Sequence, residues 1–152
     1  MAIVVGTVLS AALLVGLASR ALEVARVYAL EREQFGEPIG SFQAIKHLLA
    51  DMYVTTGLAQ SATYAAAAVL DGASSSGTDQ AAARAAASAK LLAGEAAIAN
   101  AGTAIQVLGG MGFTWAMVPH HLLKRAWVLE QGFGTADEHA AHLGATFAGA
   151  KT

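Results

Sequence analysis

The chain has 152 residues and a formal net charge of −2, with 55% hydrophobic and 13% charged residues. This length fits one domain, and so few charges predict that part of the surface is buried against another molecule. The chain has no cysteine, which excludes disulfides and thiolate metal sites, and no basic stripe, which argues against a nucleic-acid partner. The composition is compatible with the cytoplasm.

The N-terminal stretch Met1–Ser19 contains no charged side chain. Such a stretch is long enough for a short membrane span or a signal peptide. However, no Lys or Arg precedes it, Gly and Ser dilute it, and the helical pattern continues through Arg20, Glu23 and Arg26. We therefore expect a helix over Ile3–Glu33 that is buried in a bundle or interface, with membrane association as the alternative.

A second helix is predicted after a break at residues 35–40, where Gly and Pro interrupt the first one. We expect this helix over Phe42–Leu70, with Ser41 as its N-cap. Its apolar stripe has the i, i+3, i+4, i+7 spacing of an amphipathic helix and begins Ile45, Leu48, Leu49, Met52. The polar segment Asp71–Thr78 is expected to be a loop within the same domain.

The third predicted helix, Asp79–Leu108, is rich in alanine, and small side chains allow neighbouring helices to approach closely. Glycines at 109, 110 and 112 end it.

Two shorter helices complete the prediction, one over His120–Gln131 and one over Ala136–Ala148. The last begins with a capping box formed by Thr135 and Glu138. Short connections make successive helices antiparallel neighbours. The expected fold is therefore all-α, an up-and-down four-helix bundle with an additional short C-terminal helix, in a single domain over residues 1–152.

The histidines and carboxylates do not follow a metal-binding pattern. A bundle can hold a di-iron site through paired Glu-x-x-His motifs, which the chain lacks. Glu138 and His142 on the last helix are expected on a solvated face, and we predict no metal site.

Two segments stand out because their residue types suit a phosphate. The stretch 31–36 places Arg, Gln and Phe before a glycine turn, and the stretch 106–113 is rich in glycine. A guanidinium fork binds phosphate, and glycine lets a ligand approach the backbone. Each segment alone also matches a surface ion pair or a helix-ending turn.

Taken together and in order, these segments resemble the C-terminal domain of acyl-CoA dehydrogenases. The resemblance spans about Gly6 to Leu143 and rests on the stretches 28–47, 49–52, 89–91, 104–114 and 123–126. It implies a four-helix bundle in an oxidoreductase of lipid metabolism. That family oxidises acyl-CoA thioesters to trans-2-enoyl-CoA: a carboxylate removes the α-proton while flavin N5 takes the β-hydride.

The resemblance also implies a cofactor site that is shared between subunits. In the family, this bundle forms the dimer interface and clamps the FAD that a neighbouring subunit holds. Thr135 is expected to face the flavin of its own subunit. The residues that the resemblance assigns to the ADP side of the partner's FAD are Arg32, Gln34, Phe35, Gln43, Gln106, Gly109 and Gly110.

The chain departs from the family at the catalytic base. The family's glutamate directly precedes a Gly-Thr pair, here residues 134–135, and Phe133 stands in its place. Some members carry the base on the first helix, at a position that falls near Gly6. Glu130, three residues before Phe133, is a weak candidate, and Asp137 stands where an amide or glutamate is commoner.

The family also has an N-terminal helical domain and a middle β-domain, which these 152 residues do not contain. We therefore expect a C-terminal domain or a non-catalytic partner subunit that forms homo- or hetero-oligomers with acyl-CoA dehydrogenase subunits. It would complete a partner's FAD site and meet acyl-CoA only with that partner. The alternative is a catalytically inactive helical oligomerisation module.

Overall fold

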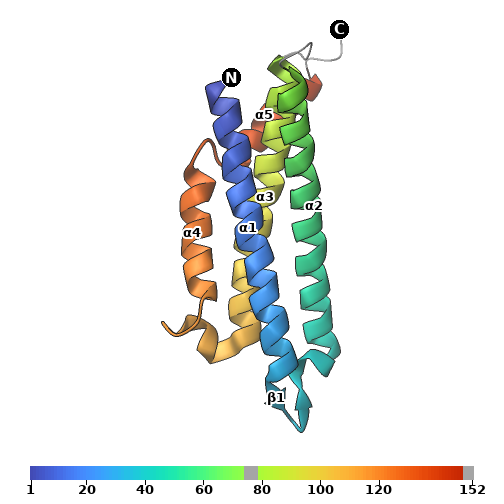
Figure 1. The fold of residues 1–152 in the computed structure, drawn as a ribbon, viewed down its shortest axis with the longest axis vertical. Coiled ribbons are helices and arrows are strands. Elements are labelled where there is room, and N and C mark those ends of the chain that lie inside the picture. The colour runs from blue at the N-terminus through green and yellow to red at the C-terminus, as the bar shows by residue number, and fades with distance from the viewer. Residues whose placement is uncertain (74–78, 149–152) are drawn as a thin grey trace.

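The computed structural model describes residues 1–73 and 79–148, and these residues form five α-helices. Figure 1 shows the three long helices running alongside one another, with α4 on the side of α1 away from α2. The expected all-α bundle is confirmed. The elements in chain order are α1 (Ala2–Glu31), β1 (Glu33–Gln34), β2 (Glu37–Pro38), η1 (Ile39–Ser41), α2 (Gln43–Ala73), α3 (Asp79–Leu108), η2 (Gly109–Phe113), α4 (Pro119–Gln131) and α5 (Ala136–Ala148).

Helix α3 is the centre of the bundle, because it contacts each of the other four α-helices. Its buried side chains recur every three or four residues, and most are alanine: Ala86, Ala89, Ala93, Ala97, Ala101 and Ala104. Small side chains let the backbones approach closely. The alanine-rich composition of this segment is therefore explained by its central position.

Helix α1 has one buried face and one exposed apolar face. Leu14 and Ala18 are fully buried against the bundle, whereas Leu9 and Leu13 are more than half exposed. Two described stretches, α1 and residues 79–113, are long and apolar enough to cross a membrane. One face of α1 is buried in the bundle, as the sequence predicted for this segment, and the other apolar face is exposed.

The connection between α1 and α2 differs from the sequence prediction in two ways. Helix α1 ends at Glu31, and a two-residue antiparallel hairpin follows that no alternation in the sequence indicated. Phe35 and Gly36 form its turn with φ of 56° and 88°, the pair of positive φ angles that a type I′ hairpin needs. The strands are too short to show a strand period.

Ser41 is not the N-cap of α2, so this prediction was wrong. Ser41 ends the 3₁₀ helix η1, and Phe42 precedes α2 and accepts a hydrogen bond from the backbone N–H of Lys46. The turn packs tightly on α1, because a Cβ at Gly40 would lie 2.9 Å from the Ala29 carbonyl oxygen. Helix α2 then continues beyond Leu70 to Ala73, and residues 74–78 of the predicted loop lie outside the described residues.

The predicted capping box is confirmed at the start of α5. The backbone N–H of Thr135 donates to the Glu138 carboxylate at 2.8 Å, and the Glu138 N–H donates to Thr135 Oγ1 at 3.3 Å. The bond from the Thr135 backbone N–H and a second bond from the Thr135 hydroxyl, at 3.3 Å, hold the pKa of the Glu138 carboxyl below its ordinary value. Helices α3 and α5 have the predicted bounds, and α4 begins one residue earlier, at Pro119.

Candidate functional site

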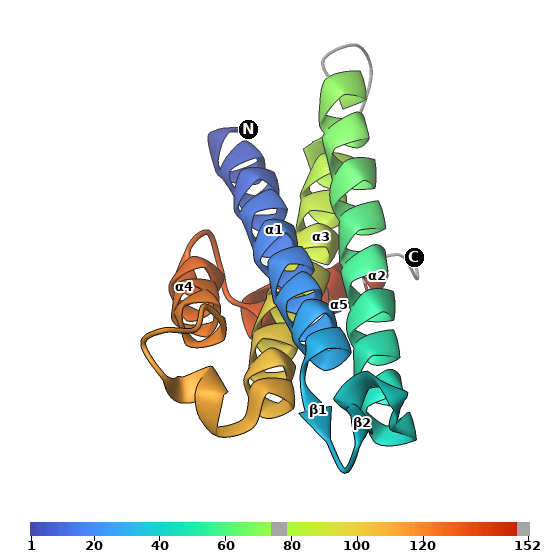
Figure 2. The same ribbon diagram turned by 60° about the horizontal axis from the view of Figure 1, so that its bottom comes forward.

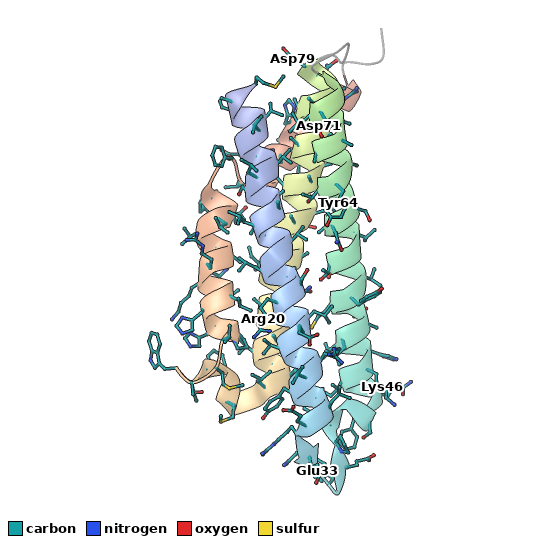
Figure 3. All side chains as sticks on the ribbon, viewed as in Figure 1. Arg20, Glu33, Lys46, Tyr64, Asp71 and Asp79 are labelled. Atoms are coloured by element: carbon teal, nitrogen blue, oxygen red, sulfur yellow. The ribbon has the colours of Figure 1, made fainter. Side chains whose placement is uncertain are left out.

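The residues assigned to the ADP side of FAD all lie at one end of the bundle. This end holds the close of α1, the β1–β2 hairpin, the start of α2 and the close of α3, and Figure 2 turns it towards the viewer. Figure 3 shows Glu33 and Lys46 at this end. We call the following exposed residues the clamp end: Arg32, Gln34, Phe35, Gln43, Gln106, Gly109 and Gly110.

The hairpin half of the clamp end presents a free cation and an aromatic ring. Arg32 ends α1 through a backbone bond to the Tyr28 carbonyl, while its guanidinium has no ion pair or hydrogen bond among the described residues. The Phe35 side chain is 94% exposed and meets the Phe42 ring edge-on, with centroids 6.1 Å apart. The side-chain amide of Gln34 donates to the Glu33 carbonyl at 2.7 Å.

The α3 half of the clamp end offers bare backbone beside the exposed amide of Gln106. Gly109 has a φ of 60°, which favours glycine, and a Cβ at Gly109 or Gly110 would meet nothing within 4 Å. At Gly112, a Cβ would lie 2.7 Å from the Ile105 carbonyl oxygen, so this turn packs tightly on α3. A free guanidinium and uncovered glycine backbone fit a diphosphate.

The two positions that carry the catalytic base in the resembled family meet in the α1–α4–α5 region. A Cβ built at Gly6 would overlap the ring of Phe133, so the two residues are in direct contact. Neither has a carboxylate. Phe133 has a φ of 62°, which costs energy for any residue other than glycine, and its ring is 54% exposed.

The loop that carries Phe133 is held by a buried side chain from another part of the chain. Lys90 of α3 is 1% exposed, and its ammonium donates to the carbonyls of Glu130 and Gly134 at 2.7 and 2.8 Å. Burial lowers the pKa of Lys90, and the nearby carboxylates of Glu130 and Glu138 oppose this shift. Sequence reasoning placed Lys90 in a family motif but missed this bridging role.

The carboxylate of Glu130, the weak candidate for a base, is engaged by its neighbours. One oxygen accepts the backbone N–H of Ala136 at 2.7 Å, and the other accepts the Gln131 amide at 2.7 Å. The bond to Ala136 ties the end of α4 to the start of α5. Thr135, expected to face flavin, is half-buried and belongs to the capping box. Among the described residues, no group of three or more His, Asp or Glu could hold a metal ion.

The clamp end and the Phe133–Gly6 contact lie near opposite ends of α1. This helix has 30 residues, and at about 1.5 Å of rise per residue it separates Gly6 from Arg32 by roughly 40 Å. Figure 1 shows the hairpin at the lower end of α1 and its N-terminus at the upper end.

Residues 2–147 match the family described as acyl-CoA dehydrogenase, C-terminal domain, and the chain belongs to this family. It is 48% identical over 111 residues to the acyl-CoA dehydrogenase FadE34 of Mycobacterium tuberculosis, covering 73% of this chain and 15% of that protein. It is 39% identical over 132 residues to the probable acyl-CoA dehydrogenase YngJ of Bacillus subtilis, covering 87% and 33%. The chain thus spans about a third or less of these relatives.

Solved structures show the same fold. The chain superposes on butyryl-CoA dehydrogenase from Megasphaera elsdenii with a TM-score of 0.88 at 28% identity, covering 95% of this chain and 36% of that one. A variant of the Tcur3481-Tcur3483 steroid ACAD gives 0.87 at 29% identity, covering 96% and 39%. PigA, solved with FAD and proline, gives 0.87 at 27% identity, covering 96% and 37%.

Proposed function

We propose that this chain is a non-catalytic partner in an FAD-dependent acyl-CoA dehydrogenase that acts in cytoplasmic lipid metabolism. In this role it forms one domain, contacts the ADP part of an FAD held by another subunit, and contributes to the oligomer interface. The bound FAD supplies the hydride acceptor for α,β-dehydrogenation of an acyl-CoA thioester. The catalytic base belongs to the partner.

One observation carries this proposal: a complete clamp end and a base position without a carboxylate occur in the same chain. Arg32 is exposed and unpaired among the described residues, whereas Phe133 and Gly6 fill the base position with an aromatic ring. The length of α1 keeps these two sites apart, so the clamp end serves a cofactor that this chain's base position does not reach.

Each part of the clamp end has a distinct task in this proposal. The Arg32 guanidinium neutralises and orients the diphosphate, and the Gly109–Gly110 backbone lets it approach closely. The amides of Gln34, Gln43 and Gln106 bind polar groups of the adenosine, and the exposed Phe35 ring covers its apolar face. Support comes from PigA, a structural relative solved with FAD, and from the paired name Tcur3481-Tcur3483.

The first test examines the purified chain alone. We would record its absorption spectrum for oxidised flavin and its size by size-exclusion chromatography on the same sample. An assembly without flavin is the expected result, because a half-site does not retain the cofactor. Dehydrogenation of an acyl-CoA by the chain alone would refute the proposal.

The second test examines the complex with catalytic acyl-CoA dehydrogenase subunits co-expressed from the same source. Arg32→Ala should lower its flavin content at least tenfold, since a charge-assisted pair to a phosphate contributes about 1.5–3 kcal/mol. Arg84→Ala is the matched control, because Arg84 is also exposed but lies near the start of α3, away from the clamp end. The alternative function, an inactive oligomerisation module, predicts that both variants leave flavin content unchanged.

A further inference from the structure

A hollow in the molecule lies where η2 and the following loop meet α3 and α4. It has a volume of about 290 Å³. Three aromatic side chains, Phe113, Trp115 and Trp127, line it together with His120 and Lys124. The volume is near the lower limit of small-molecule sites, so it suits a ligand with a single ring.

The aromatic walls of this hollow are not explained by packing within the chain. Trp115 is 79% exposed, Phe113 75% and Trp127 53%. The chain has only two tryptophans, and both are here. Large rings that stay exposed around one hollow favour a ligand that offers them an apolar or aromatic surface.

The charge around the hollow is positive, although the whole chain has a net charge of −2. The Lys124 ammonium lies 4.8 Å from the centroid of the Trp115 ring, and the His121 ring lies beside the same tryptophan at 5.3 Å. None of the described residues that line the hollow has a carboxylate. An anionic group on the ligand would therefore find the Lys124 ammonium and, among the described lining residues, no competing acid.

One polar atom in the lining has no partner. The side chain of His120 is 7% exposed, and its Nε2 is buried without a hydrogen bond among the described residues. Burial lowers the pKa of His120, and the neighbouring His121 and Lys124 lower it further, while a backbone hydrogen bond to Thr114 opposes this shift. A buried polar atom left unpaired is costly, so a ligand that reaches this imidazole gains a contact that the protein does not supply.

We propose that this hollow binds a small aromatic carboxylate. Its ring contacts the tryptophan walls, and its carboxylate pairs with Lys124 and the His120 imidazole. Binding takes up a proton, because a carboxylate beside His120 favours the charged imidazole. This site is independent of the FAD clamp, and the two proposals can fail separately.

The test uses the intact ¹⁵N-labelled chain and benzoate as the probe. The two tryptophan indole N–H signals report on the hollow directly. Both signals should shift on titration and saturate in the millimolar range or below, as expected for a ligand of this size. Benzylamine, with the same ring and the opposite charge, should bind at least tenfold more weakly.

Two variants separate recognition from surface charge. Lys124→Gln should weaken benzoate binding about tenfold, which is typical of losing one charge-assisted contact. Arg125→Gln removes the next positive charge along α4. Because Arg125 does not line the hollow, this variant should keep its affinity for benzoate within about twofold of the unaltered chain. Benzoate should also bind more tightly at about pH 6 than at about pH 8, and His120→Gln should remove this difference.

Three results would overturn the proposal. The first is the absence of a saturable shift of the indole signals, and the second is equal binding of benzoate and benzylamine. The third is an indole shift that follows protein concentration rather than benzoate, which would make this face a contact between copies. If His120→Gln does not fold, two measurements still test the proposal. One is the pH dependence of benzoate binding by the unaltered chain, and the other compares Lys124→Gln with Arg125→Gln.

Discussion

The ring of Phe133 occupies the space in which a side chain at Gly6 would stand. The two residues come from the α4–α5 loop and the first turns of α1. The Phe133 carbonyl is 3.0 Å from His139 Nε2, and Lys90 bonds the carbonyl of Gly134 beside it. The position of the Phe133 ring is therefore fixed by the positive φ of Phe133 and by the contacts that His139 and Lys90 make with the carbonyls of Phe133 and Gly134.

Replacing Gly6 should have opposite effects in two backgrounds. Gly6→Ala should destabilise the chain by about 1 kcal/mol, because displacing the Phe133 ring outweighs the helix propensity of alanine. In a Phe133→Ala background the same change should stabilise by about 0.5–1 kcal/mol. Urea unfolding of the four proteins gives the coupling between the two residues.

Gly16→Ala is the control for this cycle, because a Cβ at Gly16 of α1 meets nothing within 4 Å. It should stabilise the chain by about 0.5–1 kcal/mol in both backgrounds. If Gly6→Ala behaves like Gly16→Ala, the ring is not held against Gly6.

Restoring a carboxylate at the base position should not restore activity to the chain alone. Phe133→Glu supplies a proton acceptor, but the domains that hold the flavin ring and thioester in the family lie outside these residues. We expect no butyryl-CoA-dependent reduction of an artificial electron acceptor by this variant or by Phe133→Gln. Turnover by Phe133→Glu alone would contradict the proposed partner role.

Removing the Lys90 ammonium should loosen the loop from α4 to α5. Lys90→Met leaves the carbonyls of Glu130 and Gly134 without this donor, and should cost about 1–3 kcal/mol in urea unfolding. Burial lowers the pKa of Lys90 below 10.5. The unfolded chain therefore binds more protons between the folded-state pKa and 10.5, and stability from this group rises with pH across that window.

The Lys90→Met variant should lack this alkaline gain. Lys46→Met is the matched control: Lys46 is exposed on α2, so its loss should change stability by less than about 0.5 kcal/mol. Equal effects of the two variants would show that the buried bonds do not stabilise the loop.

Acid should weaken the same loop through His139. Burial lowers the pKa of His139 below 6.5. The unfolded chain then binds more protons as pH falls below about 6.5, so stability declines through that value towards the folded-state pKa. His139→Gln should reduce the decline between about pH 8 and about pH 5, measured as urea midpoints.

Two other histidines calibrate this measurement. His47→Gln, at an exposed position of α2, should leave the decline unchanged. His120 also has a lowered pKa, so part of the decline should persist in His139→Gln. An unchanged decline in His139→Gln would show that this ring is not tied to the Phe133 loop.

Much of the fold follows from local patterns in the chain. The alanine-rich composition and terminal glycines of α3, and the Thr135–Glu138 box at α5, predicted the bounds of these helices, because composition, breakers and capping act locally. The hairpin was missed because two-residue strands show no alternation. Ser41 was misplaced because a capping residue type does not reveal a preceding 3₁₀ turn.

Only those residues of the candidate site that belong to a family motif could be predicted from the sequence. The clamp-end residues came from a family resemblance, and their placement at one end needed only antiparallel helices. The burial of Lys90 depends on carbonyls 40 and 44 residues further along the chain. Likewise, Phe133 and Gly6 were each noticed as departures from a family pattern, whereas their contact requires the packed bundle.

The length of α1 has a consequence for how this chain can change. Residues separated by more than about 7–10 Å usually contribute additively to stability, and the clamp end is several times farther than that from Phe133. The effect of a substitution at one end on stability is therefore independent of the residues at the other end. A lineage can therefore change the Phe133 region without disturbing the clamp end, and a protein engineer can rebuild either end while treating the other as constant.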